Sequence, residues 1–374
     1  MAGFMSVFVK HNGRWVNNKH KIQILSKIAE SYENMQSALR HEPPRRIPVV
    51  LWYTRGPLGL AEGAKNIKQY YMDPDVKLST QLLPLEKFPG LLVVPGVYHD
   101  LGLATEPSGF GCSIRWDEDT PPHPEPCLED LSLVSARKAH DPYRDGLFPQ
   151  AIEHYRQMLA NLDPALVEAY PLLAGSTCIL GPLEVAGYMY GHSRFYLGMV
   201  TEPDRIHELI AYVTEGIIRW LSILEEINGG HRIISLIEHT PSLISRSNSE
   251  EFFVPYVTKI RDAFPEAIFL YHNEGPSNHY LPLVAEIGAD IFHCGDVELQ
   301  EAKKQIGDRV TLMGTVHPLY VLRDGSREEV IKESKKCIES ASEGGGFLLS
   351  SGGGLAMPVG ATPWVNISAM LESV

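Results

Sequence analysis

The sequence predicts an α/β fold: a (β/α)8 barrel over residues 45–374, preceded by a helical extension over residues 1–44. About eight short apolar runs alternate with helical stretches, and eight parallel strands, each followed by a helix, close such a barrel. Most of these runs end in polar residues or glycines, which is typical of strand ends that line a site. The chain has 374 residues, a length that such barrels reach as one domain.

The first half of the chain contains a long helix, two strands and a proline-rich segment. Apolar residues recur at helical spacing over residues 17–39, and a Pro-Pro pair stops that helix. The first strand is expected over residues 47–53 and the second over residues 91–94. Residues 117–126 are rich in proline, which constrains its own backbone and that of the preceding residue. We expect a surface loop or an insertion near the site there.

The second half contains the remaining strands, and its clearest helix begins at Thr201. The Thr201 hydroxyl can cap that helix, and Asp204 supplies the reciprocal carboxylate three residues later. Apolar residues from Ile206 to Leu224 form one stripe that packs in the core, and Gly229 follows the helix. Strands are expected over residues 170–176, 232–237, 268–275, 289–292, 309–313 and 346–349, and further helices over 147–162 and 252–264.

Composition excludes several classes of protein. Hydrophobic residues make up 44% of the chain, which is ample for a core. The net charge is −13 and no cluster of Lys and Arg occurs, so nucleic acid is not an expected partner. The five cysteines form no C-x-x-C pair, and no apolar run has membrane-spanning length. We expect a cytoplasmic protein with reduced thiols and no membrane contact.

The most informative stretch covers residues 268–275, where an apolar strand ends at His272, Asn273 and Glu274. The preceding strand ends at Glu238, which is followed by His239 and Thr240. The following strand ends at His293, Cys294 and Asp296. Because the carboxyl ends of barrel strands meet at one mouth, these side chains are expected to face a common site.

Several short motifs occur in one order along the chain and resemble those of the uroporphyrinogen decarboxylase superfamily. They are Thr201-Glu-Pro-Asp204, Leu243-Ile-Ser, Phe252-Phe-Val-Pro-Tyr256, His272-x-Glu-Gly275, Leu312-Met-Gly-Thr-Val-His-Pro318 and Thr362-Pro363-x-x-Asn366-Ile367. The resemblance covers the chain from about residue 170 onward and, more weakly, the first half. It implies the barrel fold with one of two reactions, decarboxylation or corrinoid-linked methyl transfer.

The residues at the expected mouth resemble the methyltransferase branch more closely. Decarboxylases carry an Arg-Gln-Ala-Gly-Arg-like motif after the first strand, whereas residues 51–57 of this chain contain one arginine, Arg55. Methyltransferases of the superfamily bind zinc through a histidine, a nearby cysteine and a later cysteine in a Gly-rich strand end. Here His272 matches the histidine, Glu274 replaces the first cysteine, and Gly353 falls at or near the second.

A zinc site without thiolates is chemically reasonable, because zinc also accepts histidine nitrogen and carboxylate oxygen. We predict His272, Glu274 and Glu238 as ligands, with Glu251 as a fourth candidate. Glu251 has an equally simple interpretation as a residue that favours a helix amino terminus. Cys294 is more often a small buried residue in this position, although a ligand role stays open.

The harder donor set predicts the reaction. Histidine with carboxylates leaves zinc a harder Lewis acid than thiolates do, which suits an ether oxygen better than a thiol. The resemblance then implies transfer of a methyl group from a methoxylated, aromatic substrate to the cobalt of cobalamin. No cobalamin-binding signature occurs in the chain, so the corrinoid is expected on a separate corrinoid protein.

Other residues at the predicted strand ends are candidates for substrate contact and catalysis. His317 is a candidate proton relay to the leaving oxygen, and Asp296 a second candidate catalytic group. The substrate-binding candidates are aromatic, cationic or amide side chains: Trp52, Tyr53, Arg55, Tyr98 and Asn273. One of Trp52 and Tyr53 is expected to point into packing, because neighbours alternate along a strand.

Three alternatives remain from the sequence. The chain could be a metal-free decarboxylase, a methyltransferase that delivers methyl from a methylcorrinoid to an acceptor, or a non-catalytic subunit that docks a corrinoid protein. Bound zinc that is lost in His272→Ala would favour a methyltransferase over the metal-free decarboxylase and the non-catalytic subunit.

Overall fold

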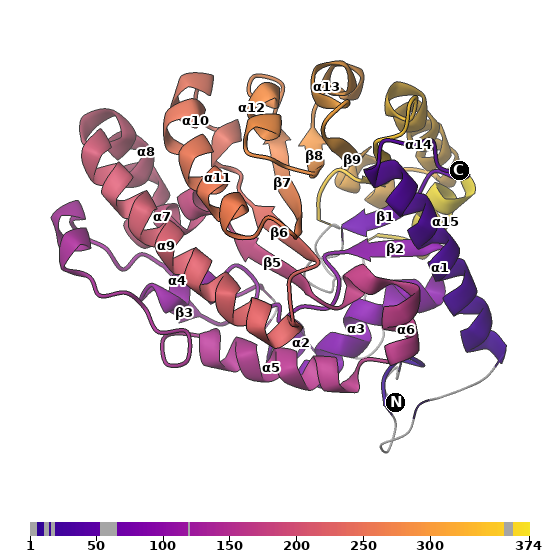
Figure 1. The fold of residues 1–374 in the computed structure, drawn as a ribbon, viewed down its shortest axis with the longest axis horizontal. Coiled ribbons are helices and arrows are strands. Elements are labelled where there is room, and N and C mark those ends of the chain that lie inside the picture. Colours follow the sequence, from indigo (N-terminus) through magenta and orange to yellow (C-terminus); the bar gives the residue numbers. More distant parts are fainter. Residues whose placement is uncertain (1–5, 11–14, 16–18, 53–65, 119, 355–361) are drawn as a thin grey trace.

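Eight parallel strands form the centre of the fold, and helices surround them (Figure 1). The computed structural model describes residues 6–10, 15, 19–52, 66–118, 120–354 and 362–374. The strands follow the order β2-β1-β10-β9-β8-β7-β6-β5, which confirms the predicted barrel. Their bounds are β1 Val49–Trp52, β2 Leu91–Val94, β5 Ser176–Leu180, β6 Ile233–Ile237, β7 Ile268–Pro276, β8 Ile291–Asp296, β9 Thr311–Val316 and β10 Phe347–Ser351.

Helices follow the strands and cover the outside of the barrel (Figure 1). Shorter helical turns span Leu131–Ala136, Pro171–Leu173, Thr240–Ser242 and Pro318–Arg323. The α-helices are α1 Lys19–Leu39, α2 Ile67–Met72, α3 Pro74–Lys87, α4 Thr105–Gly109, α5 Phe148–Asn161, α6 Pro164–Ala169, α7 Pro182–Tyr190, α8 His192–Thr201, α9 Pro203–Asn228, α10 Arg246–Phe252, α11 Val254–Ala263, α12 Leu281–Glu286, α13 Leu299–Ile306, α14 Arg327–Ala341 and α15 Trp364–Glu372. Among the described residues, no helix has both the length and the apolar character needed to span a membrane.

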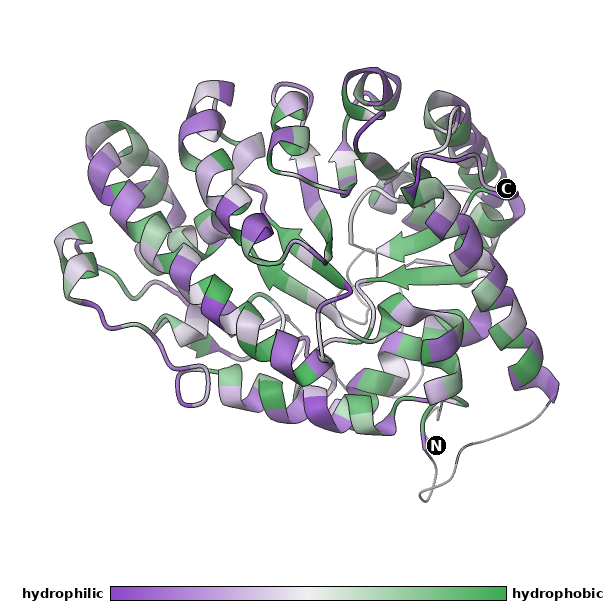
Figure 2. Ribbon diagram, in the orientation of Figure 1, coloured by the Kyte–Doolittle hydropathy of each residue, from purple (hydrophilic) through white to green (hydrophobic). Residues whose placement is uncertain are grey.

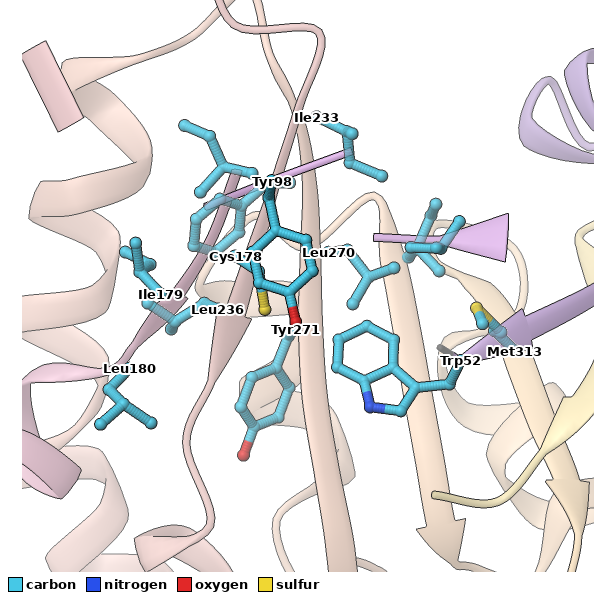
Figure 3. Packing of buried hydrophobic residues seen from close by; sticks show 14 of the residues in the cluster. Trp52, Tyr98, Cys178, Ile179, Leu180, Ile233, Leu236, Leu270, Tyr271 and Met313 are labelled. Carbon is cyan, nitrogen blue, oxygen red and sulfur yellow. The ribbon is translucent and has the colours of Figure 1, made fainter. Parts of the chain in front are cut away.

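The strands are apolar on both faces because one face fills the barrel and the other packs under helices (Figure 2). All residues of β1, β2, β5 and β10 are buried. Large side chains such as Trp52, Tyr98 and Tyr271 gather between the strands with Leu236 and Leu270 (Figure 3). The barrel interior is therefore a packed core beneath the strand ends.

The helices bury one stripe each. In α9 the predicted apolar stripe from Ile206 to Leu224 is buried, and Gly229 adopts a left-handed conformation after the last turn. The helix predicted over residues 17–39 forms as α1. It packs against β2, β10 and α6, and Gly346 N donates to the carbonyl of Ala38 at 3.2 Å. The amino-terminal helix is thus in contact with the barrel wall.

Strands β2 and β5 form the two edges of the hydrogen-bonded sheet, and loop contacts join them. Gly96, just after β2, donates its backbone N–H to Ser176 Oγ at 2.8 Å. The Val97 N–H donates to the Leu173 carbonyl at 2.8 Å. A Cβ on Gly96 would lie 2.5 Å from that carbonyl oxygen, so only glycine permits this approach. These contacts, together with the hydrogen bond from the Tyr170 hydroxyl to the Val93 carbonyl at 2.8 Å, join β2 to β5 and form the seam of the barrel.

The predicted cap of the long helix is wrong. Thr201 is the last residue of α8, and its hydroxyl donates to the Leu197 carbonyl at 3.2 Å. Helix α9 begins at Pro203, and Glu202 makes no side-chain bond as its N-cap. The sequence pattern misled because helix α8 ends at Thr201, directly before α9 begins. Pro203 is suited to the first position of α9.

Two further segments differ from their predictions. Within the range expected as a strand over residues 170–176, Pro171–Leu173 forms a helical turn, and β5 begins only at Ser176. The proline-rich range 117–126 includes β4, His123–Glu125, which pairs antiparallel with β3, Ser113–Arg115. Proline is tolerated there because this two-stranded ribbon lies outside the barrel sheet, where strands have a free edge.

The seam yields a stability prediction. Ser176→Ala should lower the free energy of unfolding by about 1–3 kcal/mol, because the buried Gly96 N–H loses its acceptor. Ser235→Ala on neighbouring β6 is the matched control, since the buried Ser235 hydroxyl has no hydrogen-bond partner. That change should stay within about 0.5 kcal/mol or stabilise the fold. Urea denaturation of both variants checks this, and equal losses would contradict the role of the seam.

Candidate metal centre

Three side chains converge at the carboxyl ends of β6 and β7. His239, His272 and Glu274 each offer one ligand atom, and these atoms all lie within 4.8 Å of one another. His272 and Glu274 are two residues apart on β7 and so point to the same side of the strand. His239 is the second residue after β6 and directly precedes the turn Thr240–Ser242. The cluster lies at the mouth of the barrel, where reactive groups of this fold gather.

A histidine pair orients His272, which is 2% exposed. Its Nδ1 lies 2.7 Å from Nδ1 of His293, and Nε2 of His293 lies 2.7 Å from the Ser351 carbonyl. A carbonyl only accepts, so Nε2 of His293 carries hydrogen. Burial lowers the pKa of His293 to about 3, which keeps its ring neutral and its Nδ1 an acceptor. Nδ1 of His272 is then the donor, and in the neutral ring Nε2 carries the lone pair.

This nitrogen of His272 faces the other ligands. Nε2 lies 3.4 Å from Oε1 of Glu274. The ring of His272 meets that of His239 nearly at a right angle, with centroids 5.4 Å apart. A histidine whose second nitrogen is held by a hydrogen bond is the usual arrangement in metal sites.

Trp52 fixes the plane of the same ring. Its indole stacks on His272 with centroids 4.3 Å apart and an angle of 18°. The indole also packs against the ring of His293, with centroids 4.7 Å apart. Trp52 is 1% exposed and sits in the packed interior of the barrel (Figure 3). The structure therefore places this predicted substrate-binding residue beneath the histidines, where it restricts their movement.

Glu184 on α7 orients His239 in a similar way. Its Oε1 accepts from the backbone N–H of His239 at 2.9 Å and lies 3.0 Å from Nδ1 of the same residue. Burial acts to raise the pKa of Glu184, but its contacts with His192 and His239 lower it to about 2. As a carboxylate it accepts the Nδ1 hydrogen, so Nε2 of His239 presents its lone pair to the cluster.

Glu238, predicted as a ligand, instead anchors α7. The side chain is fully buried, and Oε2 accepts from the N–H groups of Leu183 at 2.8 Å and Glu184 at 3.2 Å. A carboxylate at a helix amino terminus is stabilised by the helix dipole. A Cβ on Gly181 would lie 2.5 Å from that oxygen, so the contact requires glycine. Burial and the charge of Glu184 raise the pKa of Glu238.

Glu274 lies against the Gly-rich end of β10. Its Oε1 accepts from the N–H of Gly354 at 2.8 Å. A Cβ on Gly353 would lie 2.8 Å from the carboxyl carbon of Glu274, so this glutamate occupies the space beside the glycine. Burial acts to raise the pKa of Glu274, but a protonated His272 ring and the Gly354 N–H lower it well below its usual value, and a cation bound in place of that proton would act in the same direction. The cluster therefore contains a carboxylate.

Two other predicted ligands lie elsewhere. Glu251 is on α10, and its Oε1 lies 3.4 Å from Nε2 of His207 on α9, at an exposed position. The thiol of Cys294 is buried and directed at the Met313 carbonyl at 3.5 Å. Neither belongs to the group of residues that could hold one ion among those described.

The amide of Asn273 is used within the fold. Its Oδ1 accepts from Ser242 Oγ and from the Gly275 N–H, both at 2.8 Å. Its Nδ2 donates to the Glu238 carbonyl and to the Tyr271 hydroxyl, both at 3.0 Å. Asn273 therefore ties the ends of β6 and β7 together, beside the cluster.

The remaining candidates are spread around the mouth. Tyr98 lines a cavity of about 30 Å³ between the end of β2 and β5, a volume suited to water. Nδ1 of His317 accepts from the N–H groups of Leu319 and Tyr320, so His317 caps the turn Pro318–Arg323. Asp296 ends β8 and is exposed. Tyr53 and Arg55 lie outside the described residues.

Comparison with known proteins agrees with this architecture. A sequence model of the family described as Uroporphyrinogen decarboxylase (URO-D) matches residues 30–374. The fold resembles the solved structure of a methyltransferase from Methanosarcina mazei, with a TM-score of 0.74 and 19% identity, over 92% of this chain and 97% of that one.

The curated relatives carry two kinds of name. A methylated-thiol–coenzyme M methyltransferase of Methanosarcina mazei is 25% identical over 240 residues, which cover 63% of this chain and 62% of that protein. A uroporphyrinogen decarboxylase of Legionella pneumophila is 22% identical over 90% of this chain and 94% of its own length. One of Coxiella burnetii is 24% identical over 90% and 92%. The chain belongs to the uroporphyrinogen decarboxylase family, and its similarity to the methyltransferases agrees with the branch expected from its motifs.

Proposed function

We propose that this protein is a zinc-dependent methyltransferase of the cytoplasm. It moves a methyl group from a methoxylated, aromatic substrate to the cobalt of a cobalamin carried by a separate corrinoid protein. The observation that supports this most directly is the cluster of His239, His272 and Glu274 at the mouth of the barrel. The predicted ligands His272 and Glu274 belong to this cluster, His239 takes the place of Glu238, and the fourth candidate, Glu251, lies elsewhere.

The donor set fits zinc. Two imidazole nitrogens and one carboxylate oxygen are a common ligand set of catalytic zinc, which keeps a further position open for substrate. When bound, zinc would supply Lewis acidity matched to a hard donor such as an ether oxygen. The chain's own residues prepare this site: His293 and Glu184 hold each histidine with its Nε2 turned to the cluster. Glu274 adds the negative charge that a divalent cation requires.

Decarboxylation is the second candidate, since relatives named uroporphyrinogen decarboxylase align with most of the chain. A substrate with several carboxylates needs cations in its pocket. The cluster presents a carboxylate and two imidazoles, and each imidazole is neutral when its Nε2 lone pair binds a metal. This set of groups suits a bound cation better than a polycarboxylate, and we therefore favour methyl transfer.

Zinc binding is tested by two His–Glu pairs with the same separation. His272 and Glu274 lie 3.4 Å apart in the cluster, and His207 and Glu251 lie 3.4 Å apart on the outer helices. We expect His272→Ala and Glu274→Gln each to weaken zinc binding at least about 10-fold, because each removes a ligand. His207→Ala and Glu251→Gln should bind zinc as the wild type does. Metal analysis after dialysis and competition with a chromogenic chelator measure this.

The same measurement on His239→Ala decides between the two ligand sets. A fall in zinc affinity comparable to that of His272→Ala is expected from its place in the cluster. Zinc retained in full by His239→Ala would refute the cluster as the metal site, as would loss of zinc from Glu251→Gln.

The orienting carboxylate gives a separate prediction. Glu184→Gln can still accept the Nδ1 hydrogen of His239 but lacks the negative charge, and Glu184→Ala lacks the acceptor altogether. We expect zinc affinity to fall about 10-fold in the first and up to about 100-fold in the second, as for other partners of metal-bound histidine. Circular dichroism should confirm that both variants fold. Equal zinc affinity in the wild type, Glu184→Gln and Glu184→Ala would show that Glu184 does not orient a zinc ligand.

The reaction is tested with methoxylated aromatic compounds and a protein carrying reduced cobalamin. We expect the absorbance of methylcobalamin to appear together with the free phenol, to stop after zinc is chelated, and to return when zinc is added. Transfer from no methyl ether, or release of carbon dioxide from a carboxylated substrate that chelation leaves unchanged, would contradict the proposed function.

A further inference from the structure

Two cysteines face each other away from the candidate metal centre. Cys112 directly precedes β3 and Cys127 follows β4 after one residue, so the two lie at the base of one hairpin. Their Sγ atoms are 3.5 Å apart, at hydrogen-bond distance for thiols. Cys112 is 5% exposed, whereas Cys127 is partly exposed. Cys127 is thus the more exposed residue of the pair, and its sulfur is in contact with that of buried Cys112.

Arg137 holds a positive charge beside the sulfur of Cys127. Its Nη2 donates to the Cys127 carbonyl at 3.1 Å and lies 3.7 Å from Cys127 Sγ. Its Nη1 donates to the Phe110 carbonyl at 2.6 Å, which fixes the guanidinium in place. Such a cation next to a thiol favours the thiolate.

The two thiols are consequently unequal. The hydrogen bond from Cys112 and the charge of Arg137, acting against burial, lower the pKa of Cys127 below its usual value. The same hydrogen bond, together with burial, raises the pKa of Cys112. The contacts of Cys127 Sγ with the Cys112 thiol at 3.5 Å and with Arg137 at 3.7 Å therefore favour the thiolate at Cys127 over the thiol that would face the Phe110 carbonyl at 3.6 Å.

The other cysteines are less exposed than Cys127. Cys178, Cys294 and Cys337 are all buried. Burial raises the pKa of Cys294 and of Cys337, which leaves both as thiols. Because these three cysteines are buried, reactivity toward electrophilic sulfur should concentrate at Cys127.

We propose that Cys112 and Cys127 form a redox-active dithiol that reacts with low-molecular-weight disulfides. The Cys127 thiolate attacks one sulfur of the disulfide RSSR, which forms a Cys127–SR bond and releases RS⁻. That RS⁻ takes the proton of the Cys112 thiol and leaves as RSH. The Cys112 thiolate then attacks Sγ of Cys127, forms the Cys112–Cys127 bond and expels the second RS⁻. The protein loses two electrons, and RSSR gains them.

The dithiol is connected to the helix that supports the metal centre. The N–H groups of Cys127 and Leu128 donate to the Met189 carbonyl, at 3.0 and 2.9 Å. Met189 lies in the last turn of α7, whose first turn carries Glu184, about 8 Å away along the helix axis. The modification site and the carboxylate that orients His239 thus lie at opposite ends of one short helix.

The test treats the reduced full-length protein with oxidised glutathione at pH 7, quenches with acid, alkylates free thiols and maps the peptides by mass spectrometry. We expect a peptide that links Cys112 to Cys127. Cys112→Ser should accumulate glutathione on Cys127, and Cys127→Ser should leave Cys112 unmodified. Cys112→Ala replaces Cys112→Ser if the serine variant fails to fold. Cys337→Ser is the control and should form the link as the wild type does.

The role of the guanidinium is tested by the rate. Arg137→Gln should slow alkylation of Cys127 about 10-fold at pH 7, because less thiolate is present, while Arg137→Lys should retain most of the rate. The proposal is overturned if glutathione reaches another cysteine first, or if the wild type stops at the mixed disulfide. An unchanged rate in Arg137→Gln would also overturn it. A link that forms only after chelation would show a metal-binding pair instead.

Discussion

The register of β7 against its two neighbours is the constraint on which the candidate site depends. His272 pairs with Ile237 of β6 and with His293 of β8. This places His239, two residues beyond Ile237, beside the ring of His272, and puts His293 within a hydrogen bond of it. A slip of one residue would turn His272 to the other face of the sheet and separate all three rings.

Buried polar side chains convert that register into a defined set of ligand atoms. Glu238 holds the first turn of α7, α7 presents Glu184, and Glu184 determines which nitrogen of His239 faces the cluster. On the other side, Ser351 and His293 do the same for His272. Each of these groups has its partner inside the fold, so the ligand geometry is established before any ion binds. The dithiol of buried Cys112 and partly exposed Cys127 meets the same helix at its other end.

The sequence allowed part of this site to be predicted. His272 and Glu274 share one strand and one face, so their convergence follows from the period of two. Whether Glu238 or its neighbour His239 contributes the third ligand could not be decided from the strand period. Beyond the end of β6 the two adjacent side chains point in different directions, and only the structure shows which one faces the cluster. Glu251 was an acceptable donor by residue type, but it pairs with His207 on the outer helices. Glu184 carries no local signal of its role, since an acidic residue in a first helical turn is common.

By itself the sequence determined the number of the barrel strands and their order along the chain, the buried stripe of α9 and the family. These features depend on local periodicity and on motifs that are contiguous in the chain. Only the tertiary structure decided which polar groups meet. His239 and Glu184, His272 and His293, and the two thiols at the base of the hairpin are separated by 55, 21 and 15 positions. Strand register, helix packing and burial bring such pairs together, and none of these can be read from the composition of either segment alone.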